Sequence, residues 1–379
     1  MKIHNTTALL TLLALAAGAC SDGLTPPVGD GGIRLAAKVE GQTPSRSPYR
    51  PDGNQSGMPT PSTPLGVEIW ATTEANRYQH RTNEDGVPYN GSFGKEVFFH
   101  TGAHFQSGDA QLLDDAVYPR PDEGERIDVN FVGLHPIGIW SHPRENGGED
   151  YSGATAAFTG CEDVMLGPEI QGSYGMDYAA NPHLVPTFRF CHLLTCLQVR
   201  MGAELDSDSR QEKEDASEAW GKILSMTVRS RSRATLRRLS SITRENLASG
   251  VTFSEETDLD FHRIGQDGVF PAEGGFAIPT EKTDAAYVLC APVQARKGEE
   301  EYVIRIRTEK REVEIPVDLM EGEGIAEEDF TMGRWYTLLL NFRMGDIISL
   351  KAEISLEGRT DWYVHGTGSF DIQEENIRQ

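Results

Sequence analysis

The amino-acid sequence predicts an all-β protein with two β-sandwich domains in tandem. The chain of 379 residues contains 39 glycines and 20 prolines, which favours short strands and tight turns over long helices. Segments in which apolar and polar residues alternate recur along the chain, and this period of two is typical of half-buried strands. Strands spaced in this way through both halves of the chain indicate one sandwich in each half.

The first expected strand covers residues 33–39. Its apolar residues fall on one side of an extended chain: Ile33, Leu35, Ala37 and Val39. Gly41, Pro44 and Pro48 then interrupt the pattern, which places Arg46 and Arg50 in an irregular and exposed segment.

The remaining expected strands follow in both halves of the chain. They cover residues 65–71, 96–100, 114–118, 126–134, 188–202, 223–229, 285–293, 301–307, 312–319, 335–341 and 347–356. The run 188–202 is apolar enough for one long strand buried on both faces. Residues 205–218 are acidic and polar, and we expect them to form a solvated excursion. Pro316 suits an edge strand or a bulge.

The first 23 residues have the pattern of a lipoprotein signal. About ten mostly apolar residues, 8–17, are too few to span a bilayer, and the small residues of the sequence AGAC end at Cys20. We therefore expect a signal peptide over 1–19, a diacylglycerol thioether on Cys20 and a flexible tether over 20–32. The alternative is an ordinary secretory peptide that is cut nearby, with Cys20 incidental.

The charge and the absence of known motifs narrow the function classes. The formal net charge of −23 makes nucleic acid an unexpected partner, and it favours a soluble, surface-exposed protein. No nucleophile elbow, phosphate-binding loop, zinc-protease motif or dinucleotide fingerprint occurs. Counting alone does not exclude a glycosidase pair among 58 carboxylates, but no two of them stand out. We expect a protein that is not an enzyme and needs no cofactor.

Several residues resemble metal ligands, and each has a plainer interpretation. The four cysteines Cys161, Cys191, Cys196 and Cys290 have no dense disulfide spacing, although they could pair in an oxidising compartment. Cys191 and Cys196 would point to opposite faces of one strand, so they would not share a tetrahedral site. His135 and His142 bracket Trp140 and could bind a metal, but each lies beside a proline in an expected loop, which makes a metal site the less favoured interpretation.

Two charged runs also resemble ion-binding sites. Asp206, Asp208 and Glu212 lack the glycine and the final glutamate of a calcium loop. The arginine-rich run could form an anion site, but charge-balanced outer faces explain it more simply in a chain this acidic; it contains Arg229, Arg231, Arg233, Arg237, Arg238 and, just beyond, Arg244.

Five segments together resemble the fimbrillins of Bacteroides-type bacteria, the lipoprotein precursors of type V pili. They are AGAC at Cys20, IRLAAKVEGQTPSR from Ile33, LGVEIWA from Leu65, DVMLG ahead of FRFCHLLTCLQVRM, and the stretch from FTMGRWYTLLL to GSFDI at 330–372. The arginine-rich run and the loops 51–64 and 206–218 are not features of that family.

This resemblance implies two transthyretin-like Greek-key β-sandwich domains, which we place at 33–185 and 186–379. It also implies a pilus subunit carried to the outer membrane by its lipid and polymerised head to tail. An arginine-specific protease would remove the strand 33–39, and a strand of the next subunit would fill the vacated groove. Arg46–Ser47 is the favoured bond, because Arg50 precedes Pro51. Stalk, tip and anchor subunits share these motifs.

A surface glycan-binding lipoprotein is the alternative function. It would need exposed aromatic platforms, for which the candidates are Trp70, Trp140, Trp220, Trp335 and Trp362. Trp70 and Trp335 lie inside expected strands, which favours a place in the core for both.

Overall fold

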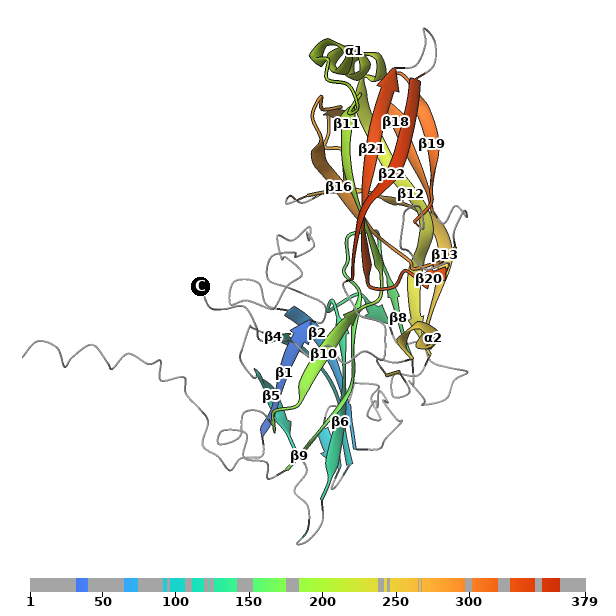
Figure 1. Ribbon diagram of the computed structural model, residues 1–379. Helices are drawn as coiled ribbons and strands as arrows, with labels where there is room; N and C mark the ends of the chain where they lie inside the picture. The colour runs from blue at the N-terminus through green and yellow to red at the C-terminus, as the bar shows by residue number, and fades with distance from the viewer. Residues whose placement is uncertain are drawn as a thin grey trace, which may run out of the picture.

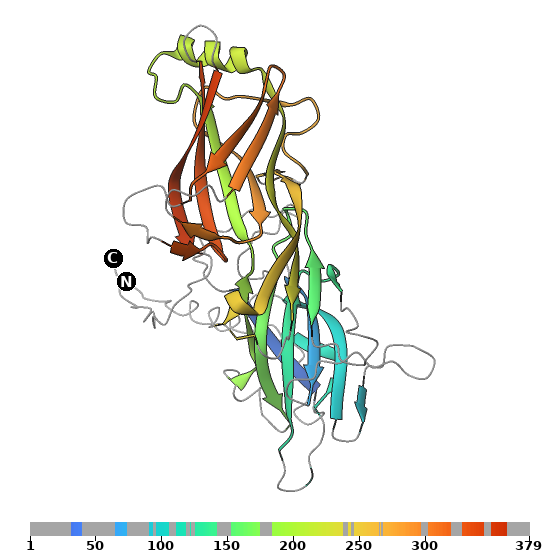
Figure 2. The same cartoon turned by 90° about the vertical axis from the view of Figure 1, so that its right-hand side faces the viewer.

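The chain folds as an all-β protein with two short helices among the described residues, which confirms the predicted fold class. In two views at right angles the strands gather in two bodies arranged end to end (Figures 1 and 2). The computed structural model describes residues 32–39, 65–73, 91–93, 96–105, 111–118, 122, 126–141, 153–174, 184–237, 242–243, 246–264, 266, 268–296, 302–319, 328–344 and 350–361.

One body contains an eight-stranded sheet in the order β3-β4-β2-β6-β9-β10-β1-β5. Its strands are β1 (Gly32–Val39), β2 (Leu65–Thr72), β3 (Gly91–Phe93), β4 (Glu96–Phe105), β5 (Gln111–Val117), β6 (Asp128–His135), β9 (Met165–Ser173) and β10 (Thr187–His192). β4 and β5 lie toward opposite ends of this order and yet approach each other, so the sheet curls around a core.

The other body contains two sheets and a small ribbon. The five-stranded sheet has the order β14-β16-β11-β21-β22: β14 (His262–Arg263), β16 (Thr283–Cys290), β11 (Thr195–Ala203), β21 (Arg334–Met344) and β22 (Leu350–Asp361). The seven-stranded sheet contains β19 (Glu312–Val317), β18 (Tyr302–Thr308), β12 (Lys222–Leu236), β8 (Ala154–Ala157), β7 (Trp140–Ser141), β13 (Val251–Asp260) and β15 (Phe276–Ala277). β17 (Gln294–Arg296) pairs with β20 (Glu328–Phe330). The helices are α1 (Arg210–Trp220) and α2 (Leu247–Gly250).

The long strand β12 connects the two bodies. Its first part pairs with β18, whereas its last four residues pair with β8, which comes from the N-terminal part of the chain. β13 runs alongside it, and Figure 2 shows this ribbon extending from one body to the other. Strands from both sides of the expected boundary between 33–185 and 186–379 share sheets. The division into these two domains stays a prediction.

The strands at the centre of the eight-stranded sheet are apolar on both faces. On β6, Val129 and Phe131 face the core inside the curled sheet, while Val132 and Leu134 belong to a larger core that continues into the other body. This alternation follows from the period of two along a strand. Pro316 lies on β19 at one end of its sheet, which confirms the expected edge position.

The expected single strand over 188–202 is wrong. The run divides into β10 and β11, which belong to different sheets, and it divides at Leu193 and Leu194. The amide of Leu193 bonds to the Val164 carbonyl at 2.9 Å, whereas the Leu194 carbonyl accepts from Gly333 at 3.0 Å. Both leucines are fully buried, so the change of sheet occurs in the core and leaves no polar turn signature in the sequence.

No helix among the described residues combines the length and apolar character needed to cross a membrane.

Candidate functional site: the first strand and its neighbours

The strand β1 lies between β5 and β10 in the eight-stranded sheet (Figure 1). Residues 36–39 pair in parallel with residues 187–190 of β10. Gly32, Arg34 and Leu35 pair in antiparallel fashion with β5. The two neighbours therefore bond to different halves of β1, and no residue of β1 is paired on both sides within the described strands.

The apolar row of β1 enters the smaller core. Ile33 and Leu35 are fully buried, Val39 is buried, and Ala37 is half-buried and packed against the same core. The strand at 33–39 is thus present with the predicted inward side. Burying Ile33, Leu35 and Val39 contributes roughly 5–9 kcal/mol to stability, at about 1.5–3 kcal/mol for each side chain. Within the folded chain, β1 is firmly held by its side chains.

Aromatic side chains line the core beneath β1. Phe188 stands edge-to-face with Phe105 at a centroid distance of 6.2 Å, and tilted against Phe190 at 5.6 Å. Tyr118 and Phe131 form a second edge-to-face pair at 6.2 Å. These rings are buried, and such pairs contribute about 0.5–1.5 kcal/mol beyond the area that they bury.

Glycines on β6 and β9 make room for these rings, and their role was not predicted from the sequence. A Cβ atom on Gly133 would lie 2.7 Å from the ring of Phe190, and one on Gly167 would lie 3.0 Å from the ring of Phe188. Each glycine therefore lets a phenylalanine lie against the bare backbone. A glycine inside a strand pattern is a known signal of such an approach, and both glycines were visible in the sequence.

The residues predicted for anchoring and processing lie outside the described residues. These are Cys20, Arg46 and Ser47, together with most of the tether 20–32 and the whole signal peptide 1–19. Lipid attachment at Cys20, cleavage at Arg46–Ser47 and exchange of the strand 33–39 stay predictions.

The cysteine residues considered as metal ligands lie in the core. Cys191 is on β10 and Cys196 on β11, both buried, and the four cysteines within the described residues are free thiols. Burial raises the pKa of Cys196 well above its usual value and also raises the pKa of Cys290; it raises the pKa of Cys161 to about 11. A thiol with a raised pKa stays protonated at neutral pH, and it is then a poor nucleophile and metal ligand.

The histidine in the sequence CHLLTC forms a buried side-chain contact with Asp163. The Nδ1 atom of His192 lies 2.8 Å from Asp163 Oδ1, and both side chains are almost completely buried. This contact lies immediately before the chain passes from β10 to β11. His135, the other histidine considered, directs its Nδ1 atom to the Gly66 carbonyl at 2.7 Å, and His142 lies outside the described residues. Within the described part of the chain, no cluster of three or more candidate ligands could hold a metal ion.

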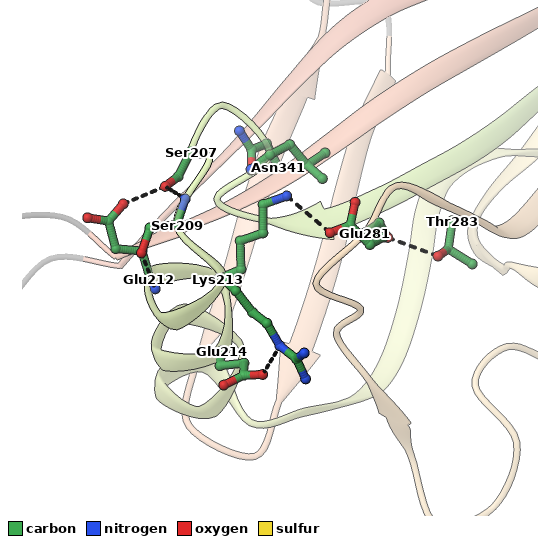
Figure 3. Close-up of polar contacts among 10 residues, drawn as sticks. Ser207, Ser209, Glu212, Lys213, Glu214, Glu281, Thr283 and Asn341 are labelled. Carbon is green, nitrogen blue, oxygen red and sulfur yellow. Dashed lines mark hydrogen bonds and ion pairs between the residues drawn. The ribbon is translucent and has the colours of Figure 1, made fainter.

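Most of the acidic run 205–218 forms helix α1, which was not predicted, and most of its residues are exposed or half-buried, in agreement with the expected solvation. Ser209 caps the helix by accepting a hydrogen bond from the Glu212 amide at 3.3 Å (Figure 3). Lys213 reaches Glu281 at 3.2 Å, which ties the helix to the loop before β16 (Figure 3). Trp220 is fully buried and donates to the Arg343 carbonyl at 3.1 Å. Glu212 thus belongs to a helix cap, and α1 packs against β11 and β21 at this end of the sheet.

The tryptophans do not form an exposed aromatic platform within the described residues. Trp70, Trp140 and Trp220 are buried, and Trp335 is half-buried. Trp362 lies outside the described residues.

The arginine-rich run is charge-balanced, as predicted. Arg233 lies 2.7 Å from Glu255, and Arg229 lies 3.7 Å from Asp258, on the paired strands β12 and β13. Asp258 also forms an ion pair with Arg305 of β18, with 3.0 Å between Arg305 Nη1 and Asp258 Oδ2. Arg238 and Arg244 lie outside the described residues.

Comparison with known proteins finds similar structures but no similar sequences. No family model matches the chain, and no curated protein matches it. A proposed cell adhesion protein of Bacteroides uniformis is 13% identical with a TM-score of 0.41, covering 89% of this chain and 99% of that one. A second proposed cell adhesion protein, of Bacteroides ovatus, is 10% identical with a TM-score of 0.42 and coverages of 88% and 98%. The fimbrial anchor protein Mfa2 of Porphyromonas gingivalis is 8% identical with a TM-score of 0.39 and coverages of 86% and 97%. These three neighbours are thus two proposed cell adhesion proteins and one fimbrial anchor protein.

Proposed function

We propose that this protein is a structural subunit of a cell-surface filament, made as a lipid-anchored precursor and polymerised when β1 is replaced by a strand of another copy. The observation that carries the proposal is the position of β1. It fills a place between β5 and β10 with a buried apolar row, and within the described strands each half of it pairs with a different neighbour. The resemblance of the sequence to fimbrillin precursors agrees with this assignment.

Physical chemistry gives β1 the properties of a replaceable strand. While it is covalently attached, its effective concentration at the site is very high, so that no other strand competes. A cut between β1 and β2 would remove this advantage. Departure of β1 would then expose the Phe105, Phe188 and Phe190 cluster and two rows of unpaired backbone groups. Such a site binds another strand by main-chain hydrogen bonds and by filling its pockets with alternate side chains.

The same geometry gives the mode of assembly. A strand donated by one copy to the site of another is a head-to-tail contact, and such contacts build an open filament when their rotation does not close a ring. We propose that the outer membrane holds the precursor through Cys20, that an arginine-specific protease cuts at Arg46–Ser47, and that the role is structural rather than catalytic.

Brief treatment of purified precursor with an arginine-specific protease tests the proposal. We expect a new N-terminus at Ser47, loss of the strand 33–39 and a ladder of oligomers in size-exclusion chromatography. Arg46→Ala should stay monomeric under the same treatment. Arg50→Ala is the matched control, because it removes a neighbouring arginine but keeps the favoured bond, and it should polymerise like the wild type.

One outcome would contradict the proposal directly. If the wild type is cut at Arg46 and remains a monomer with the strand 33–39 still bound, then β1 is a permanent part of the fold. Mass spectrometry of the protein from cells tests the anchor separately: acylated Cys20 is expected at the N-terminus of the precursor, and Cys20→Ser should release the protein from the membrane fraction.

A further inference from the structure

We propose that the β1 site selects its occupant by side-chain size at one position: any strand that fills the site must carry a small residue where β1 carries Ala37. The inference rests on the proposed function for its biological meaning, because it describes the partner strand that assembly would need. Its physical basis is the pairing of Ala37 with Phe188 in parallel strands, which puts both side chains on the same face. Ala37 packs against the core that contains Phe188.

Phe188 has no room to move away from a larger neighbour. It is fully buried, with Phe105 on one side at 6.2 Å and Phe190 on another at 5.6 Å. Its ring also lies so close to Gly167 that a Cβ atom there would be 3.0 Å away. Because protein interiors are close-packed, a large side chain at position 37 would force either Phe188 or the whole incoming strand out of place.

The other inward positions of β1 accept larger side chains. Ile33 and Leu35 are fully buried aliphatic residues, and the β-branched Val39 pairs with Phe190 at the other end of the row. The partner is therefore an extended segment with the inward pattern large, large, small, β-branched at every second residue. It runs in the direction of β1, parallel to β10, because the pattern of sizes is not symmetric about its centre.

The chain offers a matched pair of variants for the test. Ala36 and Ala37 are adjacent, identical and both half-buried, but Ala36 pairs with Thr187 and points to the opposite face. In the intact protein, Ala37→Phe should make the backbone amides of β1 and β10 exchange with deuterium about tenfold faster or more, whereas Ala36→Phe should leave them near the wild-type rates. Ala37→Ser keeps a small side chain and should also stay protected.

This measurement does not depend on cleavage, so it separates the inference from the proposed function. Equal protection of β1 in Ala37→Phe and Ala36→Phe would overturn the size rule even if the protein polymerises. If Ala37→Phe fails to fold while Ala36→Phe folds, the same rule is supported at the level of the whole domain, and Ala37→Leu then gives the graded effect.

Free peptides test the rule for a strand supplied from outside. A peptide of residues 32–39 should bind the protease-treated protein and block its polymerisation. The same peptide with phenylalanine at position 37 should not, whereas phenylalanine at position 36 should have little effect. A peptide of residues 33–39 in reversed sequence tests direction, because it places leucine beside Phe188 if it runs parallel to β10. Equal inhibition by all four peptides would show that the site binds any apolar strand, and it would overturn the size rule.

Discussion

Two pairs of parallel strands bring distant parts of this chain together, and they differ in how completely they are bonded. β11 pairs with β16 over residues 195–201 and with β21 over residues 196–203, so most of its residues have a neighbour on both sides. β1 pairs with β10 over four residues and with β5 over the other half of its length. Both strands have fully buried aliphatic side chains. The difference is therefore in the backbone ladder, which among the described residues is less complete for β1 than for β11 although both strands are tightly packed.

The largest effect is expected where β10 passes into β11, between the two parallel pairs. Asp163→Ala leaves His192 buried without its carboxylate, and removing one partner of a buried pair costs about 3–5 kcal/mol. Chemical denaturation should show this loss in the unfolding free energy. Glu162→Ala is the matched control, because Glu162 bonds to Thr159 in an exposed turn and its removal should cost less than about 1.5 kcal/mol. Similar losses in both variants would contradict a structural role for the buried contact.

The next prediction compares the local stability of the two parallel pairs. Leu197→Ala in β11 should lower the unfolding free energy by about 2–5 kcal/mol, and exchange should accelerate in both β16 and β21. Leu35→Ala in β1 removes the same groups from an equally buried position. We expect faster exchange in β1, β5 and β10 there, with unchanged rates in β11 and β21. If both variants loosen the same strands, the two pairs unfold as one unit and do not differ in local stability.

Acid should affect the five-stranded sheet through His262 on β14. Burial lowers the pKa of His262, although Glu162 and Asp260 act in the opposite direction. The unfolded chain then binds the proton more readily than the folded chain, so the unfolding free energy should fall as the pH decreases from about 6.5 toward the lower folded pKa. His262→Asn should reduce the difference in stability between pH 7 and pH 5. An unchanged difference would mean that other groups cause the acid sensitivity.

Much of the fold could be predicted from local pattern, and the failures have physical reasons. The strands expected at 65–71 and 301–307 correspond closely to β2 and β18, because apolar residues recur at every second position in both segments. The break between β10 and β11 was missed, because Leu193 and Leu194 are buried and no glycine or proline marks it. Helix α1 was missed because it is mostly charged, although Ser209 and Glu212 form the spacing of a capping box.

For the candidate site, the sequence was sufficient for the strand but not for its environment. Alternation predicted which side of the strand 33–39 is apolar. It did not predict that Ala37 lies beside Phe188, because that contact joins residues far apart in the chain and depends on the register of a parallel pair. It also did not predict that Gly133 and Gly167 underlie the rings, since a glycine within a strand can equally mark a bulge or a tight bend.

The smallest expected effect concerns the ribbon of β12 and β13 that connects the two bodies. Arg233 and Glu255 lie 2.7 Å apart, but both side chains are largely exposed, at 41% and 56%. Such a pair contributes about 0.2–1 kcal/mol, because water and salt screen it. Arg233→Gln should therefore lower the unfolding free energy by less than about 1 kcal/mol at low salt, and the difference from the wild type should vanish near 1 M salt. Arg231→Gln is the control, because it removes the same charge from an exposed residue of the same strand. Arg231 pairs in register with Glu256. A loss above about 2 kcal/mol that persists in high salt would mean that Arg233 holds the ribbon by packing rather than by charge, and the connection between the bodies would then rest on the side-chain stem.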